Sequence, residues 1–226
     1  MTACLAVWDV DGTLVDSRAI IFECCRYALV QLGFVEPTYD EVRQIVGLSL
    51  EPALAILAPG LDADQVVRAA EAYKDRFREH RRTPGFVEPL YEGALETLHR
   101  LNAEGWVMAI ATGKSRAGVD SIVALNGWQD LFVSTHCADD GPGKPHPSMV
   151  LEAMKASGFK PEHTIMIGDT SHDMRMAKAA GVRAQGVSWG FHTTAEMQVA
   201  GADHVADDFI CLNNQLSVFS QGVGRA

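Results

Sequence analysis

The sequence predicts an α/β fold: a doubly wound, Rossmann-like parallel sheet with an all-helical cap domain inserted into it. Three observations lead to this prediction. From residue 84 onward, short apolar runs alternate with helical patterns, which is typical of parallel strands covered by helices on both faces. Residues 17–83 contain helical patterns and no strand candidate. The 226 residues, 47% of them hydrophobic, suffice for one large domain and a smaller inserted one.

Five short apolar runs are expected to form the strands of the sheet. They are "LAVWD" (5–9), "WVMAIAT" (106–112), "LFVSTH" (131–136), "TIMIGD" (164–169) and "AQGVS" (184–188). Each helical segment that precedes one of the last four runs closes with a glycine, a residue that commonly ends helices. The tail "SQGVGRA" (220–226) is expected to be frayed.

The expected cap consists of helices whose apolar residues recur at spacings of three and four. One series is Ile21, Cys25, Ala28 and Leu32, and a second is Val66, Ala70, Tyr73 and Phe77. We therefore predict a catalytic core formed by residues 1–16 and 84–226 and a helical cap formed by residues 17–83. The turn-forming stretch "TPGF" (83–86) is the expected return hinge.

Composition excludes several classes of partner. A formal net charge of −10 argues against nucleic acid, which requires a basic surface. No run reaches the about 18 apolar residues that span a membrane, and no secretion leader is visible. Five cysteines without a C-x-x-C pair suit a reducing compartment. We therefore expect a cytoplasmic monomer or homodimer that binds a small molecule.

Polar residues follow the predicted strands at the ends where a parallel sheet binds its ligands. They are Asp9 and Asp11 after the first strand, Thr112, Gly113 and Lys114 after the second, Lys144 in the loop after the third, and Asp169 and Asp173 after the fourth. A random surface would scatter such residues over both edges of the sheet. Their convergence therefore predicts a functional site at the carboxyl edge.

Each motif also has an alternative interpretation. "DVDG" could open a calcium loop, but the positions that require Gly and Glu hold Leu14 and Ile20. "TGKS" (112–115) resembles the end of a nucleotide-binding loop, but Met108 stands where a glycine is required. Thr112 or Ser115 could simply cap a helix, and "GDTSHD" (168–173) could be a polar turn. The basic segment "YKDRFREHRR" (73–82) is interpreted as a solvated helix face.

Together the residues fit phosphoryl transfer to a carboxylate. Asp9 can act as the nucleophile, and Mg²⁺ bound by Asp9 and Asp169 would cancel charge. Lys144 and Thr112 can stabilise the transferring oxygens. Asp11 can protonate the leaving group and then activate water.

The motifs "DVDGT" (9–13), "ATG" (111–113), "GKPHP" (143–147) and "GDTSHD" (168–173), in this order, resemble the haloacid dehalogenase-like hydrolase superfamily. The branch they resemble is the phosphoglycolate phosphatase-like one, with a helical cap after the first strand. This resemblance implies the following roles: Asp9 as nucleophile, Asp11 as acid/base with its backbone carbonyl on Mg²⁺, Thr112 and Gly113 holding the phosphoryl group, Lys144 as the stabilising lysine, Asp169 as a metal ligand, and Asp173 orienting the metal's waters or Lys144.

The expected function is Mg²⁺-dependent hydrolysis of a small phosphate monoester, with 2-phosphoglycolate as a candidate. A phosphatase for a sugar phosphate or pyrophosphate is the nearest alternative. A sugar-phosphate mutase is less favoured, because Ile20 and Ile21 stand where the resemblance would place a cap histidine. A phospho-accepting receiver domain is disfavoured by the chain's length and cap, and a decayed, purely structural protein by the complete set of site residues.

The cap is expected to read the leaving group, since the sheet edge handles only the phosphoryl group. Its loop "VGLSL" (46–50) has small residues that allow close approach to a ligand. We therefore predict Gly47, Leu48 and Ser49 as substrate contacts. The basic segment near Arg81 and Arg82 is the less favoured place, and a plain helix connection is the alternative for the loop.

Overall fold

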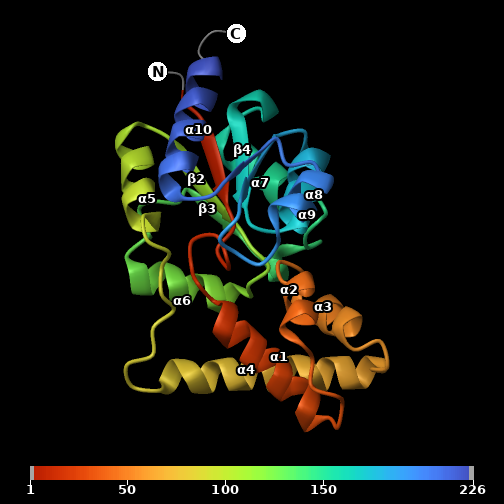
Figure 1. The fold of residues 1–226 in the computed structure, drawn as a ribbon. Coiled ribbons are helices and arrows are strands. Elements are labelled where there is room, and N and C mark those ends of the chain that lie inside the picture. The colour runs from red at the N-terminus through yellow and green to blue at the C-terminus, as the bar shows by residue number, and fades with distance from the viewer. Residues whose placement is uncertain (1–2, 224–226) are drawn as a thin grey trace.

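The computed structural model describes residues 3–223 and contains, in that range, a six-stranded sheet in the order β3-β2-β1-β4-β5-β6. Every neighbouring pair of strands is parallel. The strands are β1 (Leu5–Trp8), β2 (Val107–Ala111), β3 (Ser134–His136), β4 (Thr164–Gly168), β5 (Arg183–Val187) and β6 (His204–Ala206). The predicted doubly wound α/β fold is confirmed (Figure 1).

Helices cover both faces of the sheet, as Figure 1 shows. The core helices are α5 (Ala94–Ala103), α6 (Arg116–Asn126), α7 (Ser148–Ser157), α8 (Ser171–Ala180), α9 (Thr194–Val199) and α10 (Phe209–Val223), with short 3₁₀ turns at Ala138–Asp140 and Pro161–His163. Successive residues of a strand point to opposite faces. Accordingly Trp8 and Ile110 pack in the cluster that includes α5, α6 and α10 residues, whereas Val7 and Ala109 pack in the cluster with α7 and α8 residues.

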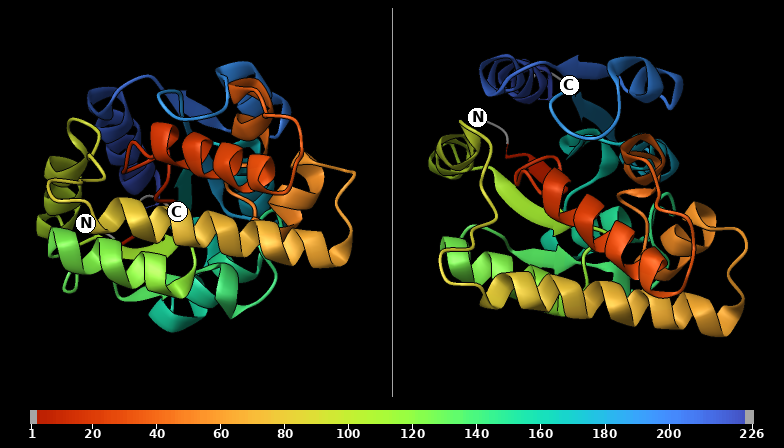
Figure 2. Two further views of the ribbon diagram at one scale, coloured as in Figure 1. Left: turned by 90° about the horizontal axis from the view of Figure 1, so that it is seen from below. Right: turned by 60° about the horizontal axis from the view of Figure 1, so that its bottom comes forward.

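Four helices form the cap between β1 and α5. They are α1 (Arg18–Gln31), α2 (Tyr39–Ile45), α3 (Leu50–Leu57) and α4 (Ala63–Arg82). The cap lies beyond the carboxyl ends of the strands, and α4 crosses α1 at its far side (Figures 1 and 2). Its own apolar cluster includes Ile21, Cys25, Val42 and Ile45, with Phe77 packed against it. The predicted helical insertion is therefore present.

The two connections between core and cap lie side by side. Val15 and Leu90 form an isolated antiparallel bridge, and Asp16 donates its backbone N–H to the carbonyl of Pro89 at 2.8 Å. The cap helices end at Arg82. We propose that the domains divide where the sequence indicated, at 16/17 and 83/84; residues 1–2 and 224–226 of that core lie outside the described range.

Several elements differ from the prediction or were not assigned by it. β3 is shorter than the expected run 131–136, because Leu131 turns back to bond Trp128 and Phe132 packs edge-on against the Trp128 ring. β6, α9 and α10 follow residue 188, where the sequence reading named no element. The tail expected to be frayed is helical over residues 220–223, and residues 224–226 lie outside the described range. Between residues 3 and 223, no helix is long and apolar enough to cross a bilayer.

Candidate active site

The carboxyl edge of the sheet brings together side chains from β1, β2, β4 and the loop before α7. Asp9, Thr112 and Asp169 each follow the last residue of a central strand. Backbone bonds continue the pairing there, from Asp9 N to Ile167 O at 2.9 Å and from Thr112 N to His136 O at 3.0 Å. All three side chains are buried. Their positions are therefore fixed by the sheet itself.

Three carboxylates and one ammonium group form the centre of this edge. Oxygens of Asp9, Asp169 and Asp173 all lie within 4.8 Å of one another. Lys144 Nζ lies 2.8 Å from Asp9 Oδ1 and 2.6 Å from Asp173 Oδ1, with all of these side chains almost fully buried. One ammonium group thus faces three buried carboxylates, which leaves an excess of negative charge.

The electrostatics follow from this crowding. Burial, together with the charges of Asp9 and Asp173, raises the pKa of Asp169 well above its ordinary value. Burial likewise raises the pKa of Asp9, while Lys144 opposes that shift. For Lys144, burial alone would lower the pKa, but Asp173 and Asp9 raise it, so the amine stays charged. A further cation is needed to stabilise all three carboxylates in ionised form.

The donor set fits a divalent cation. Asp9 Oδ2 is buried and has no hydrogen-bond partner among residues 3–223. Asp169 is held in place by Thr13 Oγ1 at 2.9 Å on one oxygen and by the Phe191 N–H at 2.8 Å on the other. Oxygen ligands with surplus negative charge suit a hard divalent ion. Asp9, Asp169 and Asp173 could therefore hold one.

Asp11 lies apart from the three-carboxylate cluster. Its Oδ1 is 2.8 Å from Lys114 Nζ. Within residues 3–223, its carboxylate does not lie close enough to the oxygens of Asp9, Asp169 and Asp173 to share a metal ion with them. Gly12 follows it with φ +81°, and a Cβ there would collide with Asp169 and Phe191. Only glycine fits that turn without strain. The turn separates the carboxylates of Asp9 and Asp11 into two environments.

The polar turns considered in the sequence are also present. Thr170 and Asp173 form a capping box at the start of α8, in which Asp173 Oδ2 accepts from the Thr170 N–H and Oγ1. The other oxygen of Asp173 faces Lys144. Ser115 caps α6 by accepting from Gly118 N, whereas Thr112 Oγ1 accepts from Lys114 N at 3.3 Å. Asp173 thus combines a capping contact with a site contact.

The cap loop containing Gly47, Leu48 and Ser49 lies directly against the core. A Cβ on Gly113 would stand 2.8 Å from the carbonyl oxygens of both Gly47 and Leu48, and a Cβ on Gly143 would collide with Ser49 Oγ. Gly47, Leu48 and Ser49 line a cavity of about 340 Å³ that also includes Asp9, Asp11 and Thr112. The loop predicted to contact the substrate therefore lies across the cavity from Asp9 and Asp11.

Two residues at or beside the cavity were given no role by the sequence. Lys114 stood within "TGKS" without an assigned function, and Glu88 in the linker carried no recognisable pattern. In the structure Lys114 Nζ lies 3.3 Å from Glu88 Oε2, and Arg81 Nη2 lies 2.7 Å from Glu88 Oε1. Burial alone would lower the pKa of Lys114, but Asp11 and Glu88 raise it.

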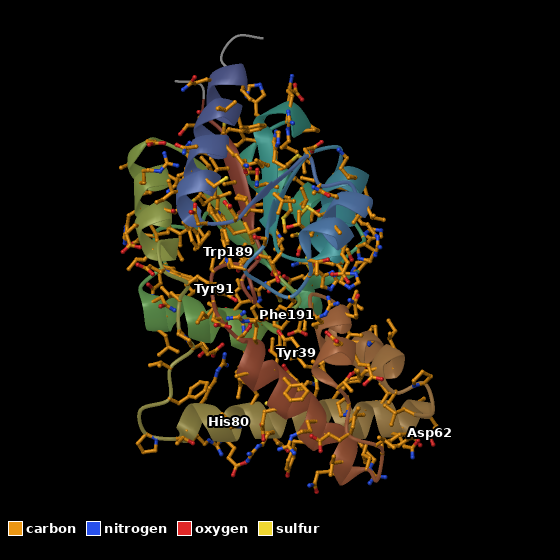
Figure 3. All side chains as sticks on the ribbon, viewed as in Figure 1. Tyr39, Asp62, His80, Tyr91, Trp189 and Phe191 are labelled. Atoms are coloured by element: carbon orange, nitrogen blue, oxygen red, sulfur yellow. The ribbon has the colours of Figure 1, made fainter. Side chains whose placement is uncertain are left out.

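The loop after β5 closes the site from the other side. Trp189 donates from Nε1 to the Thr13 carbonyl at 3.1 Å, and Tyr91 Oη donates to the Trp189 carbonyl at 3.3 Å. Figure 3 shows Tyr91, Trp189 and Phe191 at the level where the cap meets the sheet. A separate hollow of about 440 Å³, lined by Arg183 and Phe219 among others, includes residues at the amino ends of β4 and β5. The ligand edge of the sheet is the other one.

The sequence of this chain matches the haloacid dehalogenase-like hydrolase family over residues 6–187. The chain belongs to this family. It is 37% identical to a Dickeya dadantii protein named "Probable phosphatase IndB", with 91% of this chain and 90% of that protein covered. It is 29% identical to a phosphoglycolate phosphatase of Agrobacterium fabrum, with coverage of 98% and 97%.

Solved structures agree with the family assignment. A haloacid dehalogenase-like family hydrolase from Streptococcus pneumoniae superposes with a TM-score of 0.80 at 25% identity, over 96% of this chain and 98% of that one. The resemblance stated from the four sequence motifs is thereby confirmed.

Proposed function

We propose that this hydrolase is a Mg²⁺-dependent phosphomonoesterase that forms an aspartyl-phosphate at Asp9 and acts on a small phosphorylated metabolite, with 2-phosphoglycolate as the first candidate. The observation that carries this proposal is the environment of Asp9. Its buried Oδ2 has no hydrogen-bond partner in the described part of the chain, while Oδ1 is held by Lys144 at 2.8 Å. A nucleophilic oxygen must be both oriented and free to attack.

The class of enzyme, a phosphatase, is confirmed by the family and by the relatives named as phosphatases. The finer assignment of residues rests on geometry. Asp9 attacks phosphorus as the ester oxygen leaves, and Asp11 donates a proton to that oxygen. Asp11 then takes a proton from water, which attacks the phosphoryl group and releases inorganic phosphate from Asp9.

The other site residues bind and orient the substrate and the metal. Thr112 and the backbone at Gly113 hold the phosphoryl oxygens beside the Lys144 ammonium group. Mg²⁺ bound at Asp9, Asp169 and Asp173, with the Asp11 carbonyl as a further ligand, would offset negative charge on these oxygens. Gly47, Leu48 and Ser49 contact the leaving group from the cap.

Substrate choice is supported by two observations. A relative at 29% identity is named a phosphoglycolate phosphatase, and the cavity of about 340 Å³ suits a small molecule. The mutase alternative needs a proton-handling side chain in the cap, and Ile21 lines the cavity at the position considered for one. A sugar phosphate or pyrophosphate remains the nearest alternative substrate.

We also propose that the protein is a cytoplasmic monomer or homodimer without a nucleic-acid or membrane partner. Cys24, Cys25, Cys137 and Cys211 are free thiols, which suits a reducing compartment. The net charge of −10 disfavours binding to phosphate backbones.

The test is turnover of 2-phosphoglycolate and of an aryl phosphate with and without Mg²⁺. Both should be hydrolysed only with the metal, and Asp9→Asn should abolish turnover while circular dichroism shows an unchanged fold. Asp130→Asn, at an exposed loop position, is the matched control and should retain wild-type rates. Turnover above a few per cent in Asp9→Asn would overturn the covalent mechanism.

A further inference from the structure

Four charged groups from three parts of the chain meet on one side of the cavity. Lys114 of the core contacts Asp11 Oδ1 at 2.8 Å and Glu88 Oε2 at 3.3 Å. Arg81, near the end of α4 in the cap, contacts Glu88 Oε1 through Nη2 at 2.7 Å and through Nε at 3.0 Å. Glu88 lies in the linker between cap and core, with a side chain only 1% exposed. We call the set Asp11, Glu88, Arg81 and Lys114 the cationic corner.

The cationic corner has hydrogen-bond donors to spare. A lysine ammonium has three N–H groups and an arginine has five. Lys114 uses two of its three, and Arg81 Nη1 has no partner within the described part of the chain. Lys114 and Arg81 both line the cavity. Both oxygens of Glu88 are already engaged, so it cannot satisfy the remaining donors.

An aromatic ring holds the two cations close together. The Arg81 guanidinium lies 4.7 Å and the Lys114 ammonium 5.5 Å from the centre of the Phe77 ring. Phe77 also lines the cavity. The corner holds two cations and two carboxylates, Asp11 and Glu88, so its charges balance. What distinguishes it is that both cations keep N–H groups that neither carboxylate accepts, and charged donors of this kind beside a cavity favour an anionic ligand.

We propose that Arg81 and Lys114 form a subsite for a second anionic group on the leaving-group side of the substrate. This inference rests on the proposed function, because Asp11 there donates its proton to the ester oxygen. Lys114 is one hydrogen bond away from Asp11. The second anion must therefore stand only a few bonds beyond the ester oxygen, as in a short phosphorylated carboxylate or a phosphate anhydride.

The energetic consequence is discrimination against neutral leaving groups. A substrate with the second anion accepts the spare N–H groups of Lys114 and Arg81. A neutral substrate of the same size leaves them unpaired in a confined site. Charge-assisted hydrogen bonds of this type discriminate by about 10- to 100-fold.

The test compares 2-phosphoglycolate with 2-hydroxyethyl phosphate, which has nearly the same shape and lacks the carboxylate. Wild-type kcat/KM should be about 10- to 100-fold higher for the carboxylate. Arg81→Gln should reduce that ratio by about tenfold, and Arg81→Lys, which keeps the charge, should reduce it less. Arg82→Gln is the matched control, since Arg82 is exposed and outside the cavity lining.

Each outcome is decisive. A ratio near one in the wild type, or equal effects of Arg81→Gln and Arg82→Gln, would overturn the subsite. A loss of packing in Arg81→Gln would lower the melting temperature and both rates alike, leaving the ratio unchanged, and would also count against it. If 2-hydroxyethyl phosphate is hydrolysed with Mg²⁺ at the same kcat/KM as 2-phosphoglycolate, the proposed function stands while the subsite fails. The ratio of kcat/KM for pyrophosphate to that for methyl phosphate measures the preference for a second phosphoryl group. Comparing it with the ratio for 2-phosphoglycolate over 2-hydroxyethyl phosphate shows which second anion the subsite prefers.

Discussion

Lys144 is shared by two carboxylates that reach it from different elements of the fold. It pairs with Asp9 after β1 and with Asp173 at the start of α8, at 2.8 and 2.6 Å. Because all three side chains are buried, removing Lys144 would leave two uncompensated carboxylates, whereas removing one aspartate leaves a balanced ion pair. The lysine thus both orients Asp9, the proposed nucleophile, and fixes the first turn of α8.

Asp11 pairs with Lys114, whereas Asp9 pairs with Lys144. We therefore expect substitutions of the two aspartates to affect turnover in different ways. Asp11→Ala should lower turnover by roughly 10²–10⁴, the usual contribution of a general acid/base. Asp9 remains able to attack, so hydrolysis of the phospho-enzyme becomes slow and phosphate accumulates on the protein. Intact-protein mass spectrometry during turnover measures this. Wild-type activity in Asp11→Ala would refute the role, and Asp130→Ala provides the control.

At the scale of elements, the end of α2 fastens the cap to the core. Arg43 Nη1 bonds Glu196 Oε2 at 2.9 Å, and Gln44 Nε2 bonds Glu196 Oε1 at 2.6 Å. His192 Nδ1 accepts from Ser171 N, so its Nε2 carries the proton donated to the Arg43 carbonyl at 3.0 Å. These contacts hold the loop that begins at Val46 over the active site.

The contact at Glu196 predicts a pH-dependent contribution to stability. Burial alone would raise the pKa of Glu196, but bonds from Arg43, Thr193 and Gln44 lower it. A lowered carboxyl pKa stabilises the fold above the unfolded value of about 4.3 and loses that effect as pH falls through the folded value. Urea denaturation should therefore give the wild type an advantage over Glu196→Gln of about 1 kcal/mol at pH 7, vanishing in strong acid.

The control for that measurement is Glu152→Gln, because Glu152 pairs with Lys155 on the exposed surface of α7. It should change stability little at either pH. An advantage over Glu196→Gln that grows as the pH falls would contradict the assigned contact.

The cap loop predicts a change in substrate ranking. Ser49 lies against Gly143 with no room for a larger side chain between them. Ser49→Phe should raise KM for 2-phosphoglycolate by about tenfold or more, while an aryl phosphate with an activated leaving group suffers less. Steady-state kinetics on both substrates measures this. An unchanged ranking would place specificity elsewhere in the cap.

The elements also show what could be predicted from the sequence. Asp9, Thr112, Lys144 and Asp169 were found because parallel strands deliver their carboxyl ends to one edge. Lys114 was visible within "TGKS", but its partners Asp11 and Glu88 depend on how the linker returns. β6 was missed because "HVA" is too short for a periodic signal. The role of Arg81 depends on the angle at which α4 meets the core, which no local pattern encodes.

At the scale of the whole molecule, an acidic protein concentrates three carboxylates around one lysine at its active edge. Binding of Mg²⁺ there should stabilise the fold by about 2.7 kcal/mol at a hundredfold excess over Kd, equivalent to roughly 5–10 °C in melting temperature. Differential scanning fluorimetry with EDTA and with Mg²⁺ measures the shift. Ca²⁺, with its looser coordination, should bind and inhibit.

The matched control is Na⁺ at equal ionic strength, which should produce a much smaller shift. Asp169→Asn should abolish the response to Mg²⁺. An equal shift in that variant would place the metal elsewhere, and turnover that survives exhaustive chelation would refute the metal's role.

The paired connections at Val15 and Leu90 have a consequence for how such a protein can change over time. Since the chain leaves the core and returns to it at neighbouring, hydrogen-bonded positions, the backbone of the cap forms one closed loop, and the other ties to the core are local contacts such as that of Arg43 with Glu196. Doubling the length of such a loop costs about 0.6 kcal/mol in closure entropy. The cap can therefore be lengthened, shortened or exchanged while β1 and α5 stay in register. On the proposed division of roles, exchange of the cap would change the substrate and leave the phosphoryl-transfer residues of the core in place.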